Sequence, residues 1–132
     1  MITGLLHAAF SVSDIDRALA FYCDALGFRY LFLLRDEAGK PKTFYMEVGE
    51  NQYLELFLSR EQFGAQKRTE PGTLPYGYHH LTLSVSDLGE AEARLRAFGD
   101  CVCGAAETDP KTGCRRLWAR DPDGNLLEFV EA

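Results

Sequence analysis

The chain has 132 residues and a formal net charge of −6, a length that fits one domain burying about two-thirds of its unfolded surface. The acidic balance, with no basic stripe, argues against a nucleic-acid partner, and no apolar run approaches the roughly 20 residues that span a bilayer. The N-terminal residues also lack the basic region and cleavage site of a signal peptide. We therefore expect a cytoplasmic protein with no membrane partner.

The first half of the sequence predicts a βαβββ unit. Alternation of side chains predicts a strand over residues 5–12, in which His7 lies on the face opposite to Phe10. Ser13 is the predicted N-cap of the helix that follows, and Gly27 is predicted to end that helix. Turn-forming residues separate three further predicted strands, at residues 28–34, 43–48 and 52–58.

The second half repeats this order of elements. Residues 64–77 are rich in proline and glycine and are predicted to link the two halves. A strand is predicted over residues 79–85, followed by a helix that Ser86 caps and Gly99 ends. The unit is completed by predicted strands near residues 101–107, 114–119 and 125–130. Each half is therefore predicted to be α+β, with mostly antiparallel strand pairing.

A spacing of 73 residues relates two histidines and two glutamates. His7 and His80 are 73 residues apart, and so are Glu55 and Glu128. The pattern His-x-x-x-Ser-Val-Ser-Asp begins at each of these two histidines, which indicates that each half is a copy of one unit. A twofold arrangement of the copies would bring together two imidazoles and two carboxylates, a ligand set suited to a divalent metal.

Strand alternation predicts where these side chains point. Leu54 and Leu56 share the face opposite to Glu55, and the last strand of the second half repeats this pattern around Glu128. The apolar faces are expected to pack on the helices, so the acids and imidazoles face a mixed surface typical of a ligand pocket. Buried carboxylates without a partner are costly, and a cation is the expected occupant. A single strand histidine is more often structural, but its repetition favours a metal site.

A family resemblance is carried by residues 7–14, their repeat at 80–87, the helix end Leu26-Gly27-Phe28 and residues 121–128. Together these segments resemble the glyoxalase / bleomycin-resistance / dioxygenase superfamily, also called vicinal oxygen chelate proteins. The resemblance covers nearly the whole chain. It implies an α+β fold in which two tandem βαβββ modules form a curved, mostly antiparallel sheet around a metal site. It also implies one domain over residues 1–132, with module one at about 4–60, a linker at about 61–77 and module two at about 78–132.

Among the members of this superfamily, the ligand set most resembles that of glyoxalase I-like (lactoylglutathione lyase-like) proteins. The resemblance implies a divalent ion (nickel, zinc, iron, manganese or cobalt) held by four ligands, His7, Glu55, His80 and Glu128. The implied reaction is a proton transfer α to a carbonyl of a metal-chelated small molecule. Glu128 is the implied base, and Glu55 is the quasi-symmetric alternative.

The expected substrate stays open. Bacterial glyoxalase I sequences tend to have Arg and Asn where this chain has Ser11 and Ser59, so the use of glutathione is open too. Ser11, Ser59, Phe57 and Trp118 are the candidate substrate-binding residues. The alternatives are a non-catalytic drug- or toxin-binding resistance protein, or an epimerase or dioxygenase of the same superfamily. Many relatives also imply a homodimer, in which modules pair within one chain or across two chains.

Overall fold

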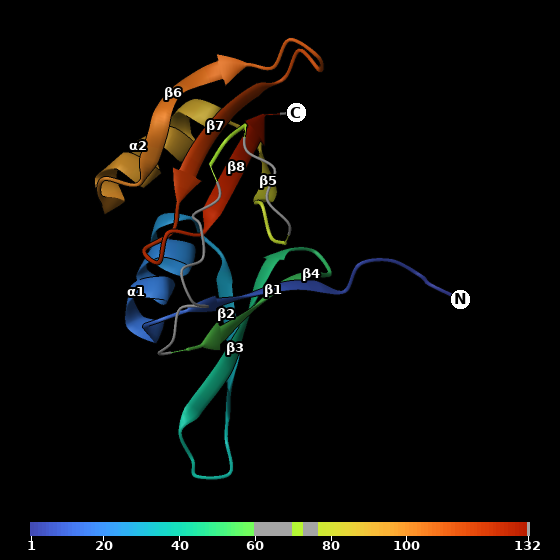
Figure 1. The fold of residues 1–132 in the computed structure, drawn as a ribbon, viewed down its shortest axis with the longest axis vertical. Coiled ribbons are helices and arrows are strands. Elements are labelled where there is room, and N and C mark those ends of the chain that lie inside the picture. The colour runs from blue at the N-terminus through green and yellow to red at the C-terminus, as the bar shows by residue number, and fades with distance from the viewer. Residues whose placement is uncertain (60–69, 73–76, 132) are drawn as a thin grey trace. The chain divides into compact units, whose positions relative to one another are not determined.

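The computed structural model describes residues 1–59, 70–72 and 77–131. The chain divides into two compact units, Met1–Ala65 and Gln66–Ala132, and each contains one four-stranded sheet and its own helical segment (Figure 1). Most of the predicted linker lies outside the described residues. No helix within the described ranges is long and apolar enough to cross a membrane.

The first unit is built from one mixed sheet. Its strand order is β1-β4-β3-β2, with β1 and β4 parallel and the other pairs antiparallel. The connection from β1 to its parallel neighbour β4 runs through the helical segment and the strands β2 and β3, and a parallel pair requires such a long connection. The four strands are β1 (His7–Val12), β2 (Arg29–Arg35), β3 (Pro41–Gly49) and β4 (Gln52–Leu58).

The helical segment of the first unit is not a single regular α-helix. A short helix α1 (Ile15–Leu19) runs directly into a π-helical segment η1 (Ala20–Ala25). Phe21 and Tyr22 of η1 are fully buried against the sheet core. The sequence predicted the helix and its end near Gly27, whose φ is +84°, but it did not predict the change of helix type, which has no clear sequence pattern.

The second unit has the same topology. Its strand order is β5-β8-β7-β6, again with one parallel pair, β5 with β8. Helix α2 ends at Gly99 as predicted, but the first strand begins at Leu81, so His80 lies just before it rather than within it. The elements are β5 (Leu81–Val85), α2 (Leu88–Phe98), β6 (Val102–Thr108), β7 (Arg115–Arg120) and β8 (Leu126–Glu131).

The predicted helix caps are wrong by one residue in both units. Asp14, not Ser13, caps α1, and Asp87, not Ser86, caps α2. Each aspartate carboxylate accepts a hydrogen bond of 2.9 Å from the backbone N–H three residues later. The negative charge of an aspartate at the N-cap also interacts favourably with the positive end of the helix dipole. This interaction explains why aspartate takes the N-cap position in both copies.

Each sheet packs one face into a hydrophobic core. Leu54 and Leu56 of the first unit and Leu127 of the second are fully buried, and Phe129 is nearly so. The predicted α+β class with two βαβββ modules is confirmed. Because strand side chains alternate, burial of these residues places their neighbours on the opposite face of each sheet, where the candidate ligands lie.

Candidate functional site

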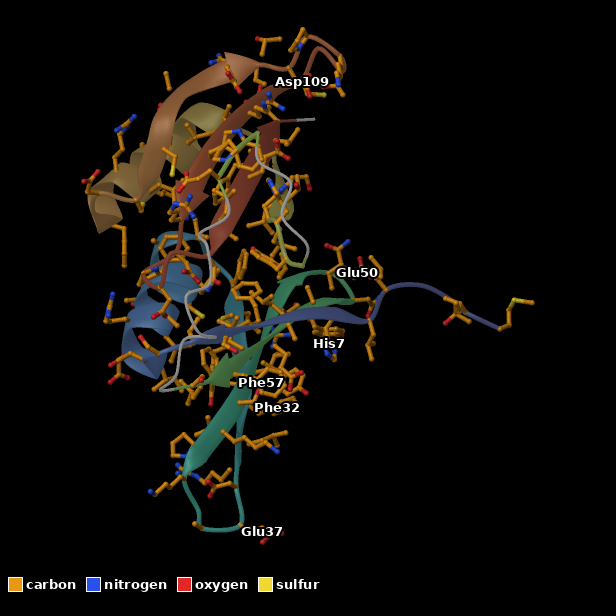
Figure 2. All side chains as sticks on the ribbon, in the orientation of Figure 1. His7, Phe32, Glu37, Glu50, Phe57 and Asp109 are labelled. Atoms are coloured by element: carbon orange, nitrogen blue, oxygen red, sulfur yellow. The ribbon has the colours of Figure 1, made fainter. Side chains whose placement is uncertain are left out.

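The first unit brings His7 and Glu55 together. Their strands are parallel neighbours, with Ala9 opposite Glu55, and His7 Nε2 lies 3.3 Å from Glu55 Oε1. Figure 2 shows His7, Phe32 and Phe57 on the side of this sheet that faces away from α1. Glu55 is nevertheless only 7% exposed, so its carboxylate depends on nearby polar groups for the hydrogen bonds that water would otherwise supply.

Two hydroxyl groups of β3 supply those hydrogen bonds. Thr43 is 3% exposed, and its hydroxyl donates to Glu55 Oε2 at 3.1 Å. Tyr45 lies directly opposite Glu55 in the strand register, and its hydrogen bond to Glu55 raises the pKa of the Tyr45 phenol. The Tyr45 ring also meets the edge of the His7 ring, with 5.9 Å between centroids. Both carboxylate oxygens of Glu55 therefore have partners.

The second unit brings His80 and Glu128 together in a similar way. His80 Nε2 lies 3.6 Å from Glu128 Oε1, and the Thr82 hydroxyl donates to the same oxygen at 2.8 Å. Arg116 Nη1 is 3.8 Å from the other oxygen, Glu128 Oε2. Trp118 lies opposite Glu128 in the register and packs edge-to-face on the His80 ring, with 4.8 Å between centroids. The second pair is thus held by different neighbours from the first.

His79 lies against His80, although the strand predicted over residues 79–85 would put these two side chains on opposite faces. The two Nδ1 atoms lie 2.7 Å apart and the rings meet edge-to-face. The difference arises because both residues precede β5 and so do not follow strand alternation. At this distance one Nδ1 must donate and the other accept. Burial lowers the pKa of His80, which favours the neutral imidazole that metal binding requires.

The separation of each histidine from its glutamate suits a shared cation. The N-to-O distances of 3.3 Å and 3.6 Å exceed the roughly 2.7–2.9 Å of a charge-assisted hydrogen bond. Two neighbouring ligand atoms that each lie about 2.1 Å from one ion are about 3 Å apart. The two N-to-O distances are close to that separation. Imidazole nitrogen and carboxylate oxygen are also ligands that divalent transition metals accept.

Among the described residues, each unit brings one histidine and one glutamate together. Within the parts of the chain that the structure describes, no group of three or more His, Cys, Asp or Glu side chains could hold a metal ion. Each unit contributes one pair of the predicted ligands, His7 with Glu55 in the first and His80 with Glu128 in the second. A full set of four requires both pairs.

The predicted substrate-binding residues fall into two groups. Ser11 pairs with Phe57 in the β1–β4 register, and the Phe57 side chain is partly exposed. The Ser59 amide donates to Val12 O at 2.9 Å and so continues the same strand pairing. Trp118 instead lies in the second unit, against His80. Phe57 and Trp118 each lie on the sheet face that carries a candidate ligand pair.

Arg116 is surrounded by acids. Its Nε donates to Glu107 Oε1 at 2.9 Å and its Nη1 to Asp109 Oδ2 at 3.3 Å, in addition to its approach to Glu128. The hydrogen bond to Glu107 raises the pKa of Arg116 further. Three carboxylates around one guanidinium leave an excess of negative charge, so this cluster suits a cation better than an anionic ligand.

Sequence reasoning missed the side chains that hold the two glutamates. They are Thr43, Tyr45 and Thr82, together with Arg116 in this role. The 73-residue spacing relates Thr43 to Arg116 and Tyr45 to Trp118. These positions carry no matching residue types, so the repeat was not visible there.

The comparisons with known proteins agree with this fold. The model of the Glyoxalase/Bleomycin resistance protein/Dioxygenase superfamily matches residues 4–129. The chain is 31% identical to a 2-epi-5-epi-valiolone epimerase of an Actinomyces species, over 94% of this chain and 76% of the relative. It is 29% identical to a lactoylglutathione lyase of Salmonella typhimurium, over 97% of this chain and 92% of that protein.

A solved structure shows the same architecture. A superfamily member from Sphaerobacter thermophilus matches with a TM-score of 0.76 and 29% identity, over 99% of this chain and 98% of that one. The chain therefore belongs to the Glyoxalase/Bleomycin resistance protein/Dioxygenase superfamily. Its relatives include enzymes with different activities, so the activity of this member must be argued from its own residues.

Proposed function

We propose that this protein is a metal-dependent, glyoxalase-like lyase or isomerase that transfers a proton next to a carbonyl of a small molecule. The observation that carries the proposal is the pair of matching contacts, His7 with Glu55 and His80 with Glu128. Each contact joins the first strand region of its unit to the last strand of that unit. Two copies of one half-site are what a four-ligand metal centre built by duplication requires.

The residues present fit a divalent metal. The four proposed ligands, His7, Glu55, His80 and Glu128, offer two neutral nitrogens and two anionic oxygens, which suits nickel, zinc, iron, manganese or cobalt. When bound, such an ion supplies Lewis acidity that stabilises negative charge on a substrate oxygen. We propose that both pairs contribute to one centre, either within one chain or between two chains.

A carboxylate of the chain is the proposed base. Glu128 Oε1 is the oxygen that faces His80 Nε2, and in the proposal a Glu128 oxygen takes the proton from the carbon next to the substrate carbonyl. The same carboxyl group then returns the proton to the neighbouring carbon. Glu55 is the quasi-symmetric alternative, because it makes the corresponding contact with His7.

The proposed substrate is a small molecule with two adjacent oxygens. Relatives named as an epimerase and as a lactoylglutathione lyase support a small-molecule substrate. Phe57 and Trp118 are proposed walls of the substrate site, since each lies on a ligand-bearing sheet face. Ser11 and Ser59 are proposed to contribute polar contacts from the first unit.

The test is proton exchange by the purified protein after metal loading. A panel of 2-oxoaldehyde hemithioacetals and acyl-CoA epimers is incubated in deuterated water, and mass spectrometry detects label at the α carbon. We expect at least one compound to gain label and to be converted to product. If the metal-loaded protein binds compounds of the panel but exchanges and converts none, it sequesters small molecules and is not a lyase or isomerase.

A further inference from the structure

We propose that Arg116 is a positioning residue that holds Glu128 for proton transfer, whereas Thr43 and Tyr45 keep Glu55 as a fixed ligand. This inference rests on the proposed function above and deepens it, because it gives the two quasi-symmetric glutamates different roles. It is carried by the side chains that lie across the strands from each glutamate.

The two glutamates occupy equivalent positions in their units. Glu55 lies opposite Tyr45 in the β3–β4 pairing, and Glu128 lies opposite Trp118 in the β7–β8 pairing. Two residues before these partners, Thr43 in the first unit corresponds to Arg116 in the second. Because the backbone register is the same here, Thr43 and Arg116 place different side chains beside two equivalent glutamates.

Glu55 lies beside hydroxyl groups of β3, in addition to its contact with His7. Thr43 donates to Glu55 Oε2, and Tyr45 lies directly opposite Glu55 in the strand register. The Thr43 hydroxyl also lies 3.0 Å from Leu56 O and is itself buried, so it is fixed in position. Neutral donors orient the carboxylate without neutralising it, and the full negative charge of Glu55 remains available to a cation.

Glu128 has a cation of the protein beside it. Arg116 Nη1 lies 3.8 Å from Oε2, which is too long for a hydrogen bond but close enough that a small rotation of the carboxylate would form one. The other oxygen, Oε1, accepts from Thr82. The Glu128 carboxylate can therefore form a second contact within the protein, with Arg116. Within the described residues, Glu55 has no arginine at the corresponding position.

Arg116 is held in place and does not follow the carboxylate. Glu107 and Asp109 bind two different nitrogens of its guanidinium group, and its central carbon lies 5.9 Å from the Trp118 ring centroid. Figure 2 places Asp109 near the connection between β6 and β7, away from the helix of this unit. A guanidinium fixed from several sides is a preorganised partner for Glu128.

In this arrangement Glu128 and Arg116 have different roles in the proton-transfer step. The substrate C–H bond breaks, its electron pair stays on the substrate, and an O–H bond forms on Glu128. Arg116 holds one oxygen of Glu128 while the other takes the proton, and the proton later returns from that oxygen to the neighbouring carbon. Of the groups proposed to take part in proton transfer, Arg116 approaches Glu128, so its effect on the reaction is through the position of that carboxylate.

The test compares Arg116→Gln with Arg116→Lys in the full-length, metal-loaded protein. Arg116 attracts the Glu128 carboxylate. Removal of the guanidinium group in Arg116→Gln should therefore lower kcat by about 10- to 100-fold with little change in KM. The same loss should tighten binding of the metal ion several-fold in a calorimetric titration, since a nearby positive charge is removed and Glu128 stays with the ion. Arg116→Lys should restore part of both quantities.

A control on the helix surface separates this effect from a general change in charge. Arg94→Gln removes an exposed arginine that pairs with Glu90 on α2, and it should change neither kcat nor metal affinity. Opposite changes of kcat and metal affinity in Arg116→Gln support the inference, since a damaged fold would lower both. Equal values in Arg116→Gln and wild type, or a parallel loss of both, would overturn it. A wild-type protein that binds no metal or turns over no substrate overturns the proposed function instead.

Discussion

At the scale of single residues, the repeat in the sequence pointed to the two His–Glu pairs but not to what holds them. His7 and Glu55 could be paired because the same spacing recurs in both halves. Thr43 and Arg116 contact the glutamates across a strand pair, and such contacts depend on a register that one strand's sequence does not contain. The ligand residues were therefore predictable, whereas their surroundings required the structure.

Glu128→Gln tests the proposed base at this scale. An amide oxygen can still coordinate a metal, so we expect a folded protein with part of its metal affinity. Proton transfer should fall by about 10²–10⁴-fold, because the amide cannot accept the proton. Deuterium incorporation into an accepted substrate measures it, with Glu92→Gln on the surface of α2 as the control. Equal exchange rates in Glu128→Gln and wild type would move the base to Glu55 or another group.

At the scale of elements, side-chain alternation located every described strand to within two residues at its start. The prediction failed where two neighbouring residue types compete for one role. Ser13 and Asp14 are both good N-caps, and the structure shows that Asp14 is used, as its equivalent Asp87 is in the second unit. The π-helical segment was also missed, because its wider hydrogen-bonded turn changes the backbone without a matching change in residue pattern.

Asp14→Ala should destabilise the first unit through loss of this cap. We expect the free energy of unfolding to fall by about 1 kcal/mol, because one backbone N–H of the first helical turn loses its acceptor. Urea unfolding followed by circular dichroism measures the change. Ser13→Ala is the comparison variant and should lower the stability less than Asp14→Ala does. A larger effect from Ser13 than from Asp14 would contradict the assigned cap.

At the scale of the whole molecule, duplication was readable from the sequence, and the structure confirms two units of one topology. The 73-residue spacing was sufficient for this because corresponding elements repeat in the same order. The homodimer was predicted only through the family resemblance, and it stays a prediction. The first unit does expose large apolar side chains along β2, namely Tyr30, Phe32 and Leu34, and such a patch is typical of a surface used for association.

We expect the protein to be a homodimer in solution. Size-exclusion chromatography with light scattering should give twice the mass of the chain. Leu34→Lys should shift the protein towards monomer, because a charge would replace an apolar side chain on the exposed patch. Glu37→Lys changes the charge at the tip of the β2–β3 hairpin (Figure 2) and serves as the control. A wild-type protein that is monomeric with metal bound would refute a site shared between chains.

Both His–Glu pairs are proposed to serve one metal centre. Elemental analysis and calorimetric titration of wild type, His7→Ala and His80→Ala measure this directly. We predict about one divalent ion for each pair of units in the wild type, and a severe loss of affinity in both variants, since each removes one ligand from a set that one unit alone cannot complete. Unchanged metal stoichiometry and affinity in His80→Ala would contradict the claim.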